Sequence, residues 1–147
     1  MTYFADLAPF TYLGPCSADA LAVGWLEADH DYVRGDVPPD VVVALERLFQ
    51  HAWEPVTAKG WHDCSLCGRQ PGDGPITREI AGRRALVGAK NLLVPAGSVM
   101  YAAPSLVIHY IEDHGYKPPD EFVAALRALD PASDEYPAEC ARLWNGG

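Results

Sequence analysis

Three metal-binding side chains lie within six residues near the middle of the chain. His62, Cys64 and Cys67 form the pattern His-x-Cys-x-x-Cys, and Gly68 follows directly. Two thiolates three positions apart can bind one ion when the chain between them turns tightly, and a glycine just after them favours that turn. In an extended approach, side chains two positions apart leave the same face of the chain, so His62 is expected beside Cys64. The pattern predicts a zinc knuckle, with Zn²⁺ as the cofactor.

The fourth position around such an ion is the main question that the pattern leaves open. A structural zinc ion has four protein ligands, whereas a catalytic zinc ion usually has three and binds water at the fourth position. His109 lies among apolar residues of a predicted helix, and we expect it to be the fourth ligand. His114 lies five residues further on, which on a regular helix turns it about 140° away from His109. The fourth ligand is therefore His109, His114 or water, and the two histidines reach one ion together only if the helix unwinds.

Hydrophobic periodicity and turn residues predict an α+β fold: a small antiparallel sheet, arranged as a meander, packed with about three helices and the zinc-knuckle loop. Helices are expected to begin at Pro104 and at two Pro-Pro-Asp sequences, because proline fits the first turn of a helix. Gly115 is expected to end the helix that begins at Pro104. The predicted strands are short and cover residues 21–26, 30–34, 76–81, 85–87, 92–94 and 99–102.

Chain length and composition predict one domain. A chain of 147 residues, about half of them apolar, buries a normal core without needing a metal merely to fold. We expect residues 1–130 to form a single metal-binding α+β domain. Residues 131–147 are polar and contain proline, which favours a loosely packed C-terminal tail.

The charge of the chain excludes several classes of partner. Its formal net charge is −9, whereas nucleic acids and anionic membrane surfaces attract Lys and Arg. No apolar run is long enough to span a membrane, and the N-terminus lacks the pattern of a signal peptide. We therefore expect a cytoplasmic protein that binds neither nucleic acid nor membrane, with its cysteines reduced or bound to metal. A protein partner or a small molecule remains as a candidate ligand.

Acidic and histidine side chains beside His109 suggest a second kind of chemistry. Glu112 and Asp113 follow His109 by three and four positions, so either can lie next to it on the helix surface. In a zinc enzyme with an open water position, Glu112, Asp113 or His114 could serve as the general base of a hydrolytic or elimination reaction. Solvated acids at a helix end are the ordinary explanation for these residues.

Several sequence blocks together resemble a known family. They are Tyr3-Phe-x-Asp-Leu, Val23-Gly-Trp-Leu, Gly60-Trp-His-x-Cys-x-x-Cys, and the block from Tyr101-x-Ala-Pro through His109-Tyr-Ile-x-x-His114 to Phe122. In these blocks the chain resembles a bacterial family of small, uncharacterised, stand-alone proteins. The resemblance implies a single cytoplasmic domain of which the knuckle and the His-Tyr-Ile block are both characteristic parts. It implies no activity.

The sequence supports two functions. In the first, a structural zinc bound by His62, Cys64, Cys67 and His109 pins the knuckle to the helix that carries His109, and the protein acts as a binding or interaction module. The alternative is a small zinc-dependent hydrolase or lyase whose fourth position holds water. A knuckle followed by glycine favours the structural role.

Overall fold

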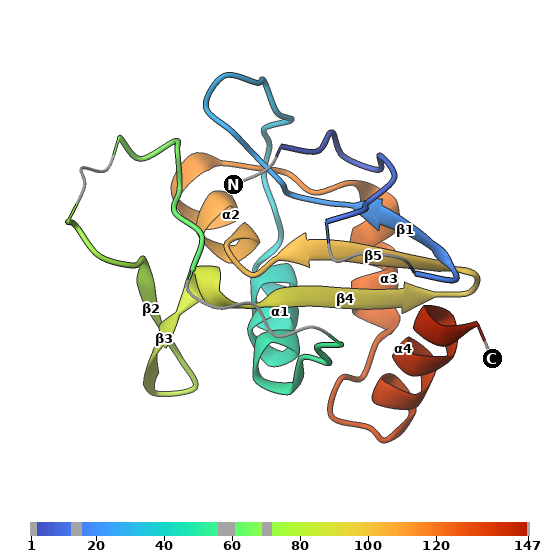
Figure 1. Cartoon of the computed structure of the whole chain (residues 1–147). Helices are drawn as coiled ribbons and strands as arrows, with labels where there is room; N and C mark the ends of the chain where they lie inside the picture. The colour runs from blue at the N-terminus through green and yellow to red at the C-terminus, as the bar shows by residue number, and fades with distance from the viewer. Residues whose placement is uncertain (1–2, 13–15, 56–60, 69–71, 147) are drawn as a thin grey trace.

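The computed structural model describes residues 3–12, 16–55, 61–68 and 72–146. Within them the chain has the mixed α+β fold that the sequence predicts (Figure 1). A three-stranded sheet has the order β1-β5-β4, and a separate antiparallel hairpin is formed by β2 and β3. The strands are β1 (Asp19–Ala22), β2 (Thr77–Ile80), β3 (Arg83–Leu86), β4 (Asn91–Ala96) and β5 (Val99–Pro104).

The strands after the knuckle do not form one continuous meander. A short 3-10 helix, η1 (Val87–Ala89), separates the β2–β3 hairpin from the β4–β5 hairpin. The third strand of the larger sheet is instead β1, which pairs parallel to β5 with Ala22 opposite Ala102. Of the predicted strand 30–34, only Arg34 is paired, in an isolated bridge to Tyr116. The order of strands thus depends on a contact between residues about eighty positions apart.

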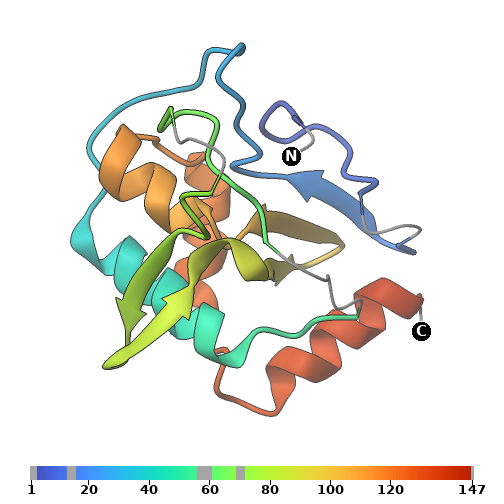
Figure 2. The ribbon, with the colours of Figure 1, turned by 60° about the vertical axis from the view of Figure 1, so that its left-hand side comes forward.

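Four helices complete the described part of the chain: α1 (Pro39–His51), α2 (Val107–His114), α3 (Asp120–Ala128) and α4 (Glu135–Asn145). The two Pro-Pro-Asp sequences begin α1 and α3 as predicted. Pro104 is the last residue of β5 rather than the start of α2, because it pairs with Asn91 across the sheet. Helices α1 and α3 pack together, and α3 and α4 pack against β4. Figure 2 shows α4 below the three-stranded sheet and the N-terminal segment above β1.

The C-terminal segment corrects the prediction of a loosely packed tail. Tyr136, Cys140 and Leu143 of α4 are buried in the core, at helical spacings of four and three residues. The Tyr136 hydroxyl donates a hydrogen bond to the Leu93 carbonyl at 2.8 Å. Pro137, which argued against a helix, lies in the first turn of α4, where a backbone N–H has no partner within the helix. The last helix is therefore part of the packed domain.

Within the described ranges, no helix combines the length and the apolar character needed to cross a bilayer.

Candidate metal centre

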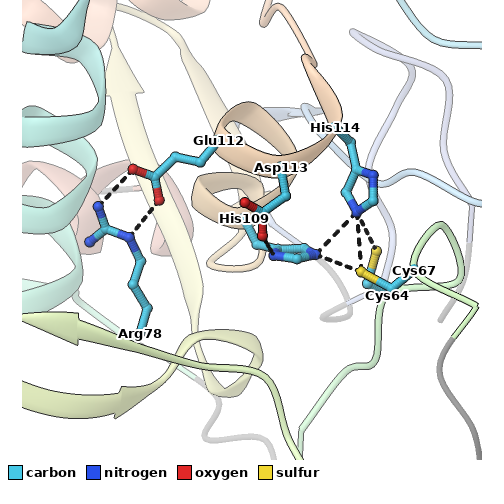
Figure 3. Close-up of polar contacts among 7 residues, drawn as sticks. All are labelled: Cys64, Cys67, Arg78, His109, Glu112, Asp113 and His114. Carbon is cyan, nitrogen blue, oxygen red and sulfur yellow. Dashed lines mark hydrogen bonds and ion pairs between the residues drawn. The ribbon is translucent and has the colours of Figure 1, made fainter.

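Four side chains from two distant segments converge on one point. Cys64 and Cys67 come from the knuckle, and His109 and His114 come from the two ends of α2 (Figure 3). One ligand atom from each residue lies within 4.8 Å of all the others. Across the part of the chain that the structure describes, this is the group of histidine, cysteine and acidic side chains that could hold a metal ion.

The separations within this group match the size of a zinc site. Cys64 Sγ lies 3.4 Å from His114 Nε2, and Cys67 Sγ lies 3.1 Å from His109 Nε2 and 3.2 Å from His114 Nε2. The two Nε2 atoms are 3.2 Å apart. Zn–N bonds of about 2.0–2.1 Å and Zn–S bonds of about 2.3 Å place neighbouring ligands of a tetrahedron about 3.3–3.8 Å apart. Four such atoms can therefore surround one ion with small adjustments.

The two histidines reach the same point although they lie five residues apart on α2. The Gly115 N–H donates to the Tyr110 carbonyl, which is five residues earlier, and the Tyr116 N–H donates to the same oxygen at 3.1 Å. Bonds of this kind end a helix, and here they close α2 directly after His114. Gly115 allows this end because it adopts a left-handed conformation, with φ of 66°. Residues Val107–His114 stay α-helical, and the two imidazole side chains reach the same point without the unwinding expected from their spacing.

The knuckle is held in place by backbone contacts on both sides of the cysteines. The Cys67 N–H lies 3.4 Å from the Cys64 carbonyl, closing the turn between the two sulfurs. The His62 N–H donates to the Gly88 carbonyl at 3.0 Å, which fixes the approach to the turn. A Cβ on Gly88 would clash with the His62 carbonyl oxygen, so only glycine fits there. Gly68, in the left-handed region with φ of 62°, ends the turn as its position in the sequence suggests.

His62 lies apart from the four converging residues. Its ring centroid is 6.0 Å from those of Tyr12 and Trp25, and burial lowers the pKa of the imidazole. The alternation expected of an extended chain does not bring it to Cys64, because the backbone at His62 is hydrogen-bonded to Gly88 and its ring packs beside Trp25. The structure thus brings together three of the four ligands that the sequence favours and adds His114 in place of His62.

The two sulfurs have different surroundings. Cys64 is 2 % exposed, and burial raises the pKa of its thiol to about 12. Cys67 is exposed to solvent. A metal ion binds thiolates, so metal binding must displace the proton of the buried Cys64.

The two acidic neighbours of His109, Glu112 and Asp113, both form ion pairs. Asp113 Oδ2 lies 2.8 Å from His109 Nδ1, the nitrogen that faces away from the sulfurs. A carboxylate in that position fixes the tautomer of a metal-binding histidine and strengthens the ligand. Glu112 is held by Arg78, whose Nε and one terminal nitrogen lie 2.6 Å and 2.9 Å from its two oxygens. Arg78 also donates to Glu46 of α1 at 2.9 Å, which ties the β2–β3 hairpin to two helices.

Sequence reasoning did not identify the residues that support the end of α2. The Tyr32 hydroxyl donates to the His114 carbonyl at 2.8 Å, and the Gly35 N–H donates to the Gly115 carbonyl at 3.1 Å. These bonds satisfy carbonyls that a helix end leaves without partners. Neither Tyr32 nor Arg78 carries a local signal for such a role, since their partners are distant in the sequence.

The fold and the site together define a small α+β protein with a two-cysteine, two-histidine cluster of the kind that binds a metal ion. The chain belongs to the family described as Domain of unknown function (DUF7919), whose model matches residues 2–127. Helix α4 lies beyond the matched range. The curated proteins and the solved structures yield no match to this chain.

Proposed function

We propose that this protein binds one zinc ion through Cys64, Cys67, His109 and His114, and that the ion has a structural role. The observation that carries the proposal is the convergence of four ligand atoms from the knuckle and α2 within 4.8 Å of one another. Two thiolates and two imidazoles at tetrahedral spacings suit zinc, whereas hard cations such as Mg²⁺ and Ca²⁺ take oxygen ligands. The ion would join the loop before β2 to the helix after β5.

The arrangement of the acidic residues favours this structural role over catalysis. A zinc enzyme needs a position for water and a free general base. The three base candidates are each engaged: Glu112 with Arg78, Asp113 with His109, and His114 with the cluster itself. With four protein ligands present, the hydrolase or lyase alternative would require one of them to leave the ion.

In the proposed function the zinc site supports a surface that binds a protein partner. Two exposed aromatic residues lie next to the knuckle. Trp61 precedes His62 and is 49 % exposed, and the ring of Tyr12, 43 % exposed, packs 6.0 Å from the His62 ring. Exposed aromatic residues are enriched at protein interfaces. The net charge of −9 suits a basic partner, and we place the protein in the cytoplasm.

Metal analysis tests the zinc site. Protein purified without added metal is expected to contain close to one zinc per chain, and Cys64→Ser is expected to lose it. X-ray absorption at the zinc edge should show two sulfur and two nitrogen ligands. Metal-free wild-type protein whose melting temperature is unaffected by added zinc would rule out the proposal.

The proposed binding surface needs a separate experiment. Wild-type protein and Trp61→Ala are compared for the proteins that they retain from a cell extract. Val43→Ala is the control, because Val43 is another exposed hydrophobic residue and lies on α1 rather than beside the knuckle. A partner that is lost with Trp61→Ala and kept with Val43→Ala supports the aromatic surface, whereas equal retention by all three proteins contradicts it.

A further inference from the structure

The two sulfurs of the candidate metal centre differ in access to solvent. Cys64 is 2 % exposed, whereas Cys67 is exposed and lines a cavity of about 580 Å³ between the knuckle, β2 and α2. His109 and Arg78 line the same cavity. A small molecule in solution can therefore meet one sulfur of the pair and not the other.

We propose that Cys67 is a site of oxidation by hydroperoxides, that a Cys64–Cys67 disulfide is the product, and that its formation releases the zinc ion. This inference rests on the proposed zinc site and adds a means of regulating it. The exposed sulfur reacts first, and the buried sulfur completes the bond.

The chemistry balances with a hydroperoxide as the oxidant. Zinc holds both cysteines as thiolates, and the thiolate is the form of cysteine that reacts. The Cys67 sulfur attacks the outer peroxide oxygen, the O–O bond breaks, and a sulfenic acid forms with loss of an alcohol, or of water when the oxidant is hydrogen peroxide. The Cys64 thiolate then attacks the Cys67 sulfur and hydroxide leaves. In sum, two thiolates, one hydroperoxide and two protons give a disulfide, an alcohol and water.

The geometry of the knuckle suits the second step. The sulfurs lie within 4.8 Å of each other on a turn closed by the Cys67 N–H and the Cys64 carbonyl. Forming the disulfide requires the sulfurs to close from this separation to a bonding distance of about 2.05 Å. A disulfide sulfur no longer carries the charge that binds zinc, so the ion would keep only His109 and His114. Two imidazoles alone hold zinc weakly, and the ion would leave.

The remaining cysteines provide internal controls. Cys140 is fully buried in α4, and the Cys16 thiol lies 3.8 Å from the Leu143 carbonyl of the same helix. Neither belongs to the cluster around the metal centre. The double variant Cys16→Ser/Cys140→Ser should therefore retain the zinc ion and its response to peroxide.

The experiment treats zinc-loaded protein with hydrogen peroxide and follows zinc release with a metallochromic indicator. One zinc should be released for every two thiols lost, with a mass decrease of two hydrogens. Peptide mapping should place the disulfide between Cys64 and Cys67. Dimedone, which traps sulfenic acids, should label Cys67. Reduction with dithiothreitol followed by added zinc should restore the metal content.

Each remaining result rules out the inference. Zinc that stays bound while both sulfurs remain unmodified contradicts it. Dimedone labelling of Cys64 ahead of Cys67, or a disulfide that involves Cys16 or Cys140, contradicts the assignment of the exposed sulfur. Failure of the proposed zinc site can be told apart from failure of this inference, because the wild-type protein would then contain no zinc before peroxide is added. That result would remove this inference as well.

Discussion

The Nε2 atoms of His109 and His114 lie 3.2 Å apart, although the residues are five positions apart on one helix. On a regular α-helix their side chains would point about 140° apart. Bonds from Gly115 and Tyr116 to the Tyr110 carbonyl close α2 directly after His114, and the two rings nevertheless converge on one point beside the helix. The pair thereby supplies both nitrogen ligands of the proposed site.

The first prediction concerns these two histidines. His109→Ala and His114→Ala should each lose bound zinc and lower the melting temperature, because each removes one of four ligands. His62→Ala is the control and should keep the zinc, since His62 packs beside Trp25 outside the cluster. Zinc content per chain and thermal unfolding with and without a chelator measure both effects. Zinc loss in His62→Ala with retention in His114→Ala would reverse the ligand assignment.

The second prediction concerns the carboxylate behind His109. Asp113→Asn removes the charge that lies 2.8 Å from His109 Nδ1 and should weaken zinc binding by about tenfold, the lower end of the effects seen for such partners. The lower end applies because the Asp113 side chain is 61 % exposed. Competition with a chelator of known affinity measures the change. Glu112→Gln is the adjacent control: it disturbs the pair with Arg78 and should leave zinc affinity unchanged.

The third prediction tests how the knuckle is positioned. Gly88→Ala should weaken zinc binding and stability together, because the added Cβ would collide with the His62 carbonyl and displace the approach to the cysteines. Gly97→Ala is the control for glycine replacement. A Cβ on Gly97 meets no atom within 4 Å, so only its positive φ of 64° opposes the change. That strain costs about 1 kcal/mol and should leave zinc affinity intact. Equal zinc affinity in the two variants would show that Gly88 does not position the site.

The fourth prediction concerns the packing of α4. The buried Tyr136 hydroxyl donates to the Leu93 carbonyl and accepts from the Trp53 N–H at 3.4 Å. Tyr136→Phe should therefore lower the free energy of unfolding by about 1–3 kcal/mol, since both backbone groups lose a partner. Urea unfolding measures the loss. Tyr12→Phe, at an exposed ring, should change the free energy of unfolding by less than about 0.5 kcal/mol. An unchanged stability of Tyr136→Phe would indicate that α4 packs loosely after all.

The sequence by itself determined the features that depend on near neighbours. The turn that holds Cys64 and Cys67 is predicted from their spacing of three and from Gly68, whose left-handed conformation is a local property of glycine. The Pro-Pro-Asp sequences begin α1 and α3, and Gly115 ends α2, because backbone angles and first-turn preferences act locally. The α+β class followed from the same short-range patterns.

Only the tertiary structure decided which histidines face the sulfurs. His62 is two residues from Cys64, yet its ring packs beside Trp25, whereas His114 is fifty residues away and within 3.4 Å. The parallel pairing of β1 with β5 and the burial of α4 are likewise non-local. Such contacts form where apolar surfaces of distant segments are buried against each other. A short stretch of sequence shows which of its residues are apolar, but not which distant segment will cover them.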